Sequence, residues 1–106
     1  MEDLTPEENQ RQGQALYEIT VWCQACNHHL GELADQYHRE DFDKLIIKSK
    51  KLLLNISDPF YSSAGMHAII SVLVKADLVN EARELLAEVE VDFIREEIIE
   101  ENPVLG

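Results

Sequence analysis

Apolar residues recur at intervals of three and four along most of this chain, the spacing that places side chains on one face of an α-helix. The first series comprises Ala15, Leu16, Ile19, Trp22, Cys23, Cys26, Leu30, Leu33 and Tyr37. Its helix should begin earlier, because Thr5 can cap it, Pro6 suits the first position and Glu8 can reach back to the cap. We therefore predict a first helix from Pro6 to Tyr37, whose polar beginning, within residues 1–14, is expected to project or fray.

A second helix is predicted from the cap Asp41 to about Asn55, after a short connection at residues 38–40. Its apolar face carries Phe42, Leu45, Ile46, Leu52 and Leu53, and another face carries Lys44, Lys48 and Lys51. A third helix should begin at Ser57-Asp58-Pro59, where a capping side chain again precedes proline. Its later part, residues 68–74, is apolar on nearly every side, which indicates the central, buried helix of the fold.

A turn at Ala76-Asp77-Leu78 precedes the fourth predicted helix, which should end before Pro103. Its expected buried face is Ala82, Leu85, Leu86, Val89 and Phe93. Acidic residues at the same period form an adjacent ridge of Glu81, Glu84, Glu88 and Asp92. Short connections make consecutive helices antiparallel neighbours. The prediction is an all-α fold of about four antiparallel helices, arranged as two packed hairpins.

A β-strand is the competing assignment for residues 68–74, because several of them are β-branched. No second apolar run offers a strand that could pair with it, so helix is preferred. The length of 106 residues, with four glycines and three prolines, favours a single helical domain over residues 1–106. Residues 102–106 follow the last helix and are predicted to be a flexible tail.

Charge is the most unusual property of the composition. Twenty-one acidic residues against nine basic ones give a formal net charge of −12, which argues against nucleic acid or an anionic membrane as a direct partner. The segment from Glu81 to Glu101 alone contains nine acids and two arginines. Four of the nine bases are Lys44, Lys48, Lys50 and Lys51, and this basic face could meet the acidic last helix of the same or another molecule. Solubility alone would also account for the charge.

The N-terminal sequence Met1-Glu2-Asp3 is acidic where a secretion signal would be basic. No apolar run approaches the roughly 18 residues of a membrane-spanning helix. We therefore expect a cytoplasmic protein.

Residues 67–86 combine an apolar helix, a short turn and the sequence Glu81-Ala82-Arg83-Glu84-Leu85-Leu86. In this arrangement a small residue such as Ala82 lets two helices approach closely. The segment resembles one α-hairpin repeat of the tetratricopeptide or pentatricopeptide type. The resemblance implies binding of peptides or proteins, as in small helical adaptors and secretion chaperones.

The sequence Trp22-Cys23-Gln24-Ala25-Cys26 is similar to the W-C-x-x-C redox site of thioredoxin-like proteins. That fold requires strands around the site, and none is predicted here. Both cysteines fall within the apolar stripe of the first helix, where cysteine is a common small core residue. Core packing is the preferred interpretation, and a thiol redox function is an alternative.

Cys23, Cys26 and His29 could also ligate zinc, with His67 as a fourth ligand. Successive residues of a helix turn by about 100°, so three positions spaced by three do not converge on one ion. A zinc site is therefore a minor alternative, and no metal or cofactor is expected.

Catalysis is not expected, because the carboxylates form no catalytic motif and neither a phosphate-binding loop nor a Ser/His/Asp motif is present. The leading hypothesis is a non-catalytic protein-binding module, namely an adaptor, chaperone or inhibitor. Its expected partner is another protein, and a protein with a basic surface is one candidate. Aromatic residues are enriched in binding hot spots, and the candidate anchors are Trp22, Tyr37, Phe60 and Tyr61. Homodimerisation is an open possibility.

The alternative function is imitation of a polyanion. The acidic ridge of the last predicted helix could occupy the basic nucleic-acid channel of a target such as a host defence complex, as small phage-encoded inhibitors do. Steep salt dependence of binding would distinguish this mode from an apolar interface.

Overall fold

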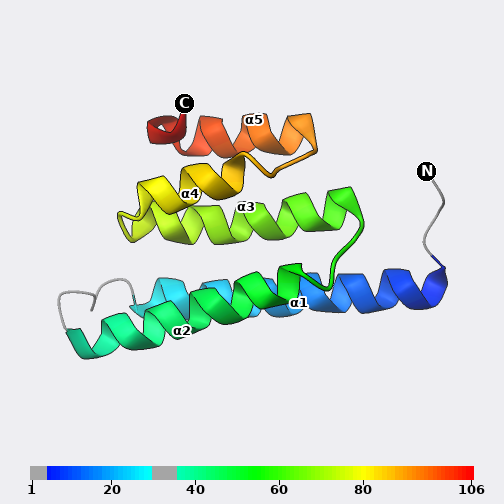
Figure 1. Cartoon of the computed structure of the whole chain (residues 1–106), viewed down its shortest axis with the longest axis horizontal. Helices are drawn as coiled ribbons and strands as arrows, with labels where there is room; N and C mark the ends of the chain where they lie inside the picture. The colour runs from blue at the N-terminus through cyan, green and yellow to red at the C-terminus, as the bar shows by residue number, and fades with distance from the viewer. Residues whose placement is uncertain (1–4, 30–35) are drawn as a thin grey trace.

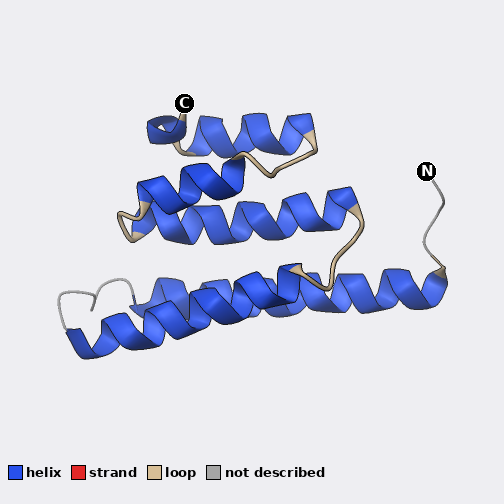
Figure 2. Ribbon diagram, in the orientation of Figure 1, coloured by secondary structure: helices blue, strands red, loops and turns tan. Residues whose placement is uncertain are grey.

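The computed structural model describes residues 5–29 and 36–106, with the side chains of residues 5–24 and 43–106. Over these ranges the chain is helical, with no strand (Figure 1, Figure 2). The helices are α1 (Pro6–His29), α2 (Gln36–Leu53), α3 (Pro59–Lys75), α4 (Val79–Leu86), α5 (Asp92–Glu101) and the short 3-10 helix η2 (Pro103–Leu105). The all-α prediction is confirmed, and the prediction of four helices is wrong because the last of them is divided in two.

The helices form layers stacked along the intermediate dimension of a molecule measuring 46 × 28 × 17 Å (Figure 1). α1 and α2 run antiparallel as one layer, α3 packs on both of them, and α4 and α5 pack on α3 (Figure 1). The predicted central position of the third helix is confirmed, since α3 contacts four other helices. Its residues Ile69, Ile70, Val72 and Leu73 are at most 1% exposed.

The predicted helix starts are confirmed at two places. The backbone N–H of Glu8 donates to Oγ1 of Thr5 at 3.2 Å, and Pro6 is the first residue of α1. The backbone N–H of Tyr61 donates to Oδ1 of the cap Asp58 at 3.0 Å, one residue before Pro59 begins α3. Capping side chains satisfy N–H groups that a helix leaves without partners at its start.

The boundary between the first two helices was predicted too late in the chain. α1 ends at His29 and α2 begins at Gln36, so Tyr37 and the expected connection at residues 38–40 belong to α2. Arginine, glutamate and glutamine have high helix propensity, so residues 36–40 extend a helix as readily as they connect two. Leu30 and Leu33 of the predicted stripe lie outside the described residues.

The fourth predicted helix is interrupted at residues 87–91. The residues predicted to form its buried face therefore do not all lie on one side of a single helix. Val89 in this connection is 1% exposed, and its carbonyl accepts a hydrogen bond from Nη2 of Arg95 at 2.6 Å. The break turns α5 so that Ile94 and Ile98 enter the core, at 5% and 0% exposure. Phe93, predicted to be buried, is 60% exposed.

The C-terminal residues form part of the packed structure rather than the predicted flexible tail. Leu105 in η2 is 7% exposed and belongs to the core cluster. Nη2 of Arg83 in α4 donates to the backbone carbonyl of Val104 at 2.8 Å. The end of the chain is thereby joined to α4.

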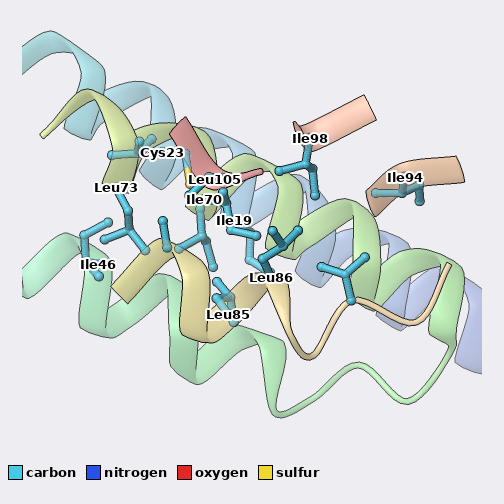
Figure 3. Packing of buried hydrophobic residues seen from close by; sticks show 14 of the residues in the cluster. Ile19, Cys23, Ile46, Ile70, Leu73, Leu85, Leu86, Ile94, Ile98 and Leu105 are labelled. Atoms are coloured by element: carbon cyan, nitrogen blue, oxygen red, sulfur yellow. The ribbon is translucent and has the colours of Figure 1, made fainter. Parts of the chain in front are cut away.

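One hydrophobic core extends through all of these layers. Figure 3 shows side chains from every helix meeting in it, among them Ile19, Cys23, Ile46, Leu73, Leu86, Ile98 and Leu105. Gly65 allows α3 to approach α1 and α2 closely, because a Cβ there would lie 2.8 Å from Cδ2 of Leu53 and 3.3 Å from Cδ1 of Ile19. Ala82 is fully buried where α4 packs on α3. The resemblance of this hairpin to a tetratricopeptide-type repeat stays a prediction.

The polar beginning of α1 contacts the rest of the fold at two positions. Gln12 is 2% exposed and hydrogen-bonds to the connection between α2 and α3. The hydroxyl of Tyr61 in α3 donates to Oδ1 of Asn9. These two contacts attach the N-terminal half of α1 to the segment that begins α3.

Candidate protein-interaction groove

A groove of ≈ 790 Å³ lies where the C-terminal end of α2, the first turns of α3 and helix α4 meet. α2 contributes Lys50 and Leu53, and Leu54 follows at its end. α3 contributes Ser62 and Met66. The groove exists because α4 packs on α3 beside α2, leaving the surface between them uncovered.

Apolar side chains form one part of this groove. Leu54 is 85% exposed, Leu53 and Met66 are half-buried, and Leu85 is buried. Burying apolar surface contributes roughly 25 cal/mol per Å² to association or folding. An exposed leucine beside such a strip is therefore a favourable contact point for another apolar surface.

Carboxylates form the other part. Glu81 and Glu84 project from α4, while Glu88 and Glu90 belong to the connection after it, and all four are exposed. Within the described residues, no salt bridge joins these four carboxylates to a lysine or arginine. Lys50 is the one basic residue among those that line the groove. The excess of negative charge raises the local concentration of cationic groups.

Three of the four residues of the predicted acidic ridge therefore lie together, and the fourth lies apart. Glu81, Glu84 and Glu88 line one groove. Asp92 follows the break and lies in the first turn of α5, where a carboxylate interacts favourably with the helix dipole. The prediction of one ridge along a continuous helix is wrong, because residues 87–91 are not helical.

The acidity of the C-terminal part extends beyond the groove. All nine acids from Glu81 to Glu101 are exposed. The two arginines of this segment each have a guanidinium N–H directed to a backbone carbonyl, Arg83 to Val104 and Arg95 to Val89. Oε2 of Glu101 lies 2.6 Å from Nε2 of His67, which links α5 to α3.

The predicted aromatic anchors lie elsewhere on the molecule. Phe60 is 51% exposed, and its ring centroid is 6.2 Å from that of Phe93 and 6.2 Å from that of Tyr61. Tyr61 is half-buried. Phe93 completes this aromatic cluster, and sequence analysis missed it because an apolar residue at helical spacing was assigned to the core.

The other two predicted anchors belong to the hairpin of α1 and α2. Trp22 is half-buried, and Nζ of Lys48 lies 4.0 Å from its ring centroid, a cation–π contact between α1 and α2. Tyr37 is in α2, and its side chain lies outside the described part of the structure. The four aromatic candidates therefore do not line the groove as one set, since none of those with described side chains contributes to it.

Cys23 is 4% exposed and belongs to the core cluster, as the packing interpretation predicts. The side chains of Cys26 and His29, needed for the redox and zinc alternatives, lie outside the described residues. Among the side chains of residues 5–24 and 43–106, no three His, Cys, Asp or Glu are placed to hold a metal ion.

None of the helices in the described ranges has the length and apolar character needed to cross a membrane. In comparisons with known proteins, no protein family, curated protein or solved structure shows significant similarity to this chain.

Proposed function

We propose that this chain is a non-catalytic protein-binding module that holds a basic, partly apolar helical surface of a partner protein in the groove between α2 and α4. The observation that carries the proposal is the groove itself, in which exposed Leu54 and a strip of apolar side chains face four exposed carboxylates. An amphipathic helix with apolar residues on one side and lysines or arginines beside them has the complementary surface.

The two parts of the groove would contribute differently to binding. Burial of Leu54, Leu53 and Met66 would supply much of the affinity, because apolar burial is the general driving force of association. The carboxylates of Glu81, Glu84 and Glu88 would attract basic partners and select against acidic ones. A role without catalysis fits these positions, since enzymes that use carboxylates place them in enclosed, distinct environments.

The test uses a synthetic helical peptide of leucine, alanine and lysine, with leucines on one face and lysines beside them. Binding is measured by isothermal titration calorimetry with the wild-type chain and with the E84Q/E88Q variant. Exposed ion pairs contribute about 0.2–1 kcal/mol each, so the variant should bind about twofold to thirtyfold more weakly. The E97Q/E100Q variant of α5 is the matched control, and it should bind as the wild type does.

Two further measurements identify the apolar part of the site. The L54S variant should also weaken binding, and a peptide of the same composition with leucines on all sides should bind less than the amphipathic one. Equal binding of both peptides, or equal loss in the groove and control variants, would contradict the proposal.

A second candidate function rests on the nine exposed acids from Glu81 to Glu101 and on the engagement of both local arginines with backbone carbonyls. In this alternative the acidic C-terminal part occupies the nucleic-acid channel of a basic protein. The chain should then displace DNA from that protein with steep salt dependence. The E97Q/E100Q variant should displace less DNA, while L54S should displace as much as the wild type.

A further inference from the structure

The outward face of α2 combines lysines with large exposed apolar side chains. Lys44, Ile47, Lys48, Lys51 and Leu54 follow one another at helical spacing of three and four residues. All five are exposed, Ile47 to 54% and Leu54 to 85%. This face is therefore a basic amphipathic surface on a chain whose net charge is −12.

This basic face and the acidic groove adjoin each other. Leu54 belongs to the basic face and also lines the groove, where Lys50 of α2 forms part of the same wall. The face and the groove cannot fill each other within one molecule, because α2 is itself one wall of the groove. Two copies related by a twofold axis can pair them twice, since such an interface joins the same patch on both subunits.

The charged rows also have the same number of members at matching spacing along the chain. Lys44, Lys48 and Lys51 lie on α2 at intervals of four and three residues, while Glu81 and Glu84 lie on α4 and Glu88 follows in the turn directly after α4. Three lysines of one copy can thus lie along the three glutamates Glu81, Glu84 and Glu88 of the other. Ile47 and Leu54 of each copy would be covered by the apolar strip of the other.

We propose that the occupant of the groove is a second copy of this chain, bound through the basic amphipathic face of α2 in a twofold-symmetric dimer. This inference rests on the proposed function, in which the groove holds a basic, partly apolar helical surface, and it names that surface. Burial of Ile47 and Leu54 drives the association. The two sets of opposite charges determine the register and orientation of the copies.

The test is a pair of charge reversals examined by sedimentation equilibrium. The K44E/K51E variant makes both surfaces acidic, and the E84K/E88K variant makes both basic, so each variant alone should be monomeric while the wild type is a dimer. Mixed in equal amounts, the variants should form a heterodimer, because both of its contacts join opposite charges. Lys48 is left unchanged because its Nζ lies over the Trp22 ring at 4.0 Å.

The matched control is E96K/E100K, which reverses two exposed charges of α5 away from the groove and should remain a dimer. Circular dichroism of each variant verifies that the helices are retained. A wild-type chain that stays monomeric up to millimolar concentration would overturn the inference. So would a dimer that survives both charge reversals.

The outcome also separates this inference from the proposed function. If the wild-type chain is monomeric and binds the leucine–lysine peptide, and the E84Q/E88Q variant binds the peptide more weakly, the dimer is refuted and the proposed function is supported. A monomeric chain that binds no basic peptide would refute both. A dimer abolished by either reversal and restored by mixing would support both.

Discussion

Oε1 of Gln12 in α1 accepts a hydrogen bond at 2.9 Å from the backbone N–H of Asp58, the residue that caps α3. The same oxygen accepts from the N–H of Ser57 at 3.2 Å, and Nε2 of Gln12 donates to Oγ of Ser57 at 2.8 Å. Gln12 is 2% exposed. A buried amide thus satisfies the two backbone N–H groups, of Ser57 and Asp58, that directly precede α3.

Replacing Gln12 tests how much these hydrogen bonds contribute to the stability of the fold. Gln12→Ala should lower the free energy of unfolding by about 1–3 kcal/mol, because it leaves two partly buried N–H groups without their partner. Urea denaturation followed by circular dichroism measures the change. Gln14→Ala, at an exposed position of the same helix, should change the stability by less than about 0.5 kcal/mol. Equal effects of the two substitutions would show that the Gln12 contacts contribute nothing.

The turn that follows α3 contains a strained residue whose replacement should stabilise the protein. Asp77 has φ of 63°, in the left-handed region that favours glycine. Around it, the N–H of Leu78 donates to the carbonyl of Leu73 at 2.8 Å, and the N–H of Asp77 donates to that of Val74 at 3.0 Å. This pattern is a Schellman motif, in which glycine is the usual residue at the position of Asp77.

Asp77→Gly should therefore raise the free energy of unfolding by about 0.5–1 kcal/mol, visible as a higher melting temperature in a thermal scan. Asp77→Asn removes the charge but keeps a side chain that tolerates this backbone conformation, so it should leave stability nearly unchanged. If Asp77→Asn and Asp77→Gly raised the free energy of unfolding by similar amounts, the cause would be the charge of Asp77 rather than backbone strain.

Two helical glycines provide a matched test of packing. A Cβ at Gly65 would meet side chains of α1 and α2 within 3.3 Å, whereas a Cβ at Gly13 would meet no atom within 4 Å. Gly65→Val should therefore cost about 1–3 kcal/mol by overpacking the contact of three helices. Gly13→Val should be neutral or slightly stabilising, since valine has higher helix propensity than glycine. Equal stability of the two variants in urea denaturation would contradict the close approach at Gly65.

The break between α4 and α5 predicts losses of stability of very different size for two apolar residues of α5. Ile98 is fully buried and Phe93 is 60% exposed. Ile98→Ala should lower the free energy of unfolding by about 2–5 kcal/mol, and Phe93→Ala by less than about 1 kcal/mol. Chemical denaturation of both variants compares them directly. A larger loss at Phe93 would instead indicate one continuous helix with Phe93 on its buried face.

Local signals account for the parts of the fold that sequence analysis predicted correctly. Caps at Thr5 and Asp58, followed by proline, involve residues within one helical turn of each other. Periodic apolar residues assign Ile19, Cys23 and Ile46 to the core in the same way. These interactions depend on spacing along the chain, so the chain order of residue types is sufficient to predict them.

The candidate site was predicted in part for the same reason. The acidic residues Glu81, Glu84 and Glu88 were identified from their spacing, but the groove that they line with Leu54 and Met66 was not. Leu54 directly follows α2 and Met66 lies in α3, and both precede Glu81 by fifteen or more positions in the sequence. Only the packing of α4 on α3 beside α2 brings the two sets together.

The sequence by itself determined that this chain is helical, that its negative charge is concentrated after residue 80, and that residues 59–75 form the central helix. The tertiary structure decided where the last predicted helix is interrupted and which of Phe93 and Ile98 is buried. The physical reason is that the break involves residues far apart in the sequence, since the N–H of Val91 donates to Oγ of Ser63 in α3 and α5 packs on α3. The spacing of apolar residues shows which side of a single helix is apolar. Whether that side is buried depends on which other helices pack against it.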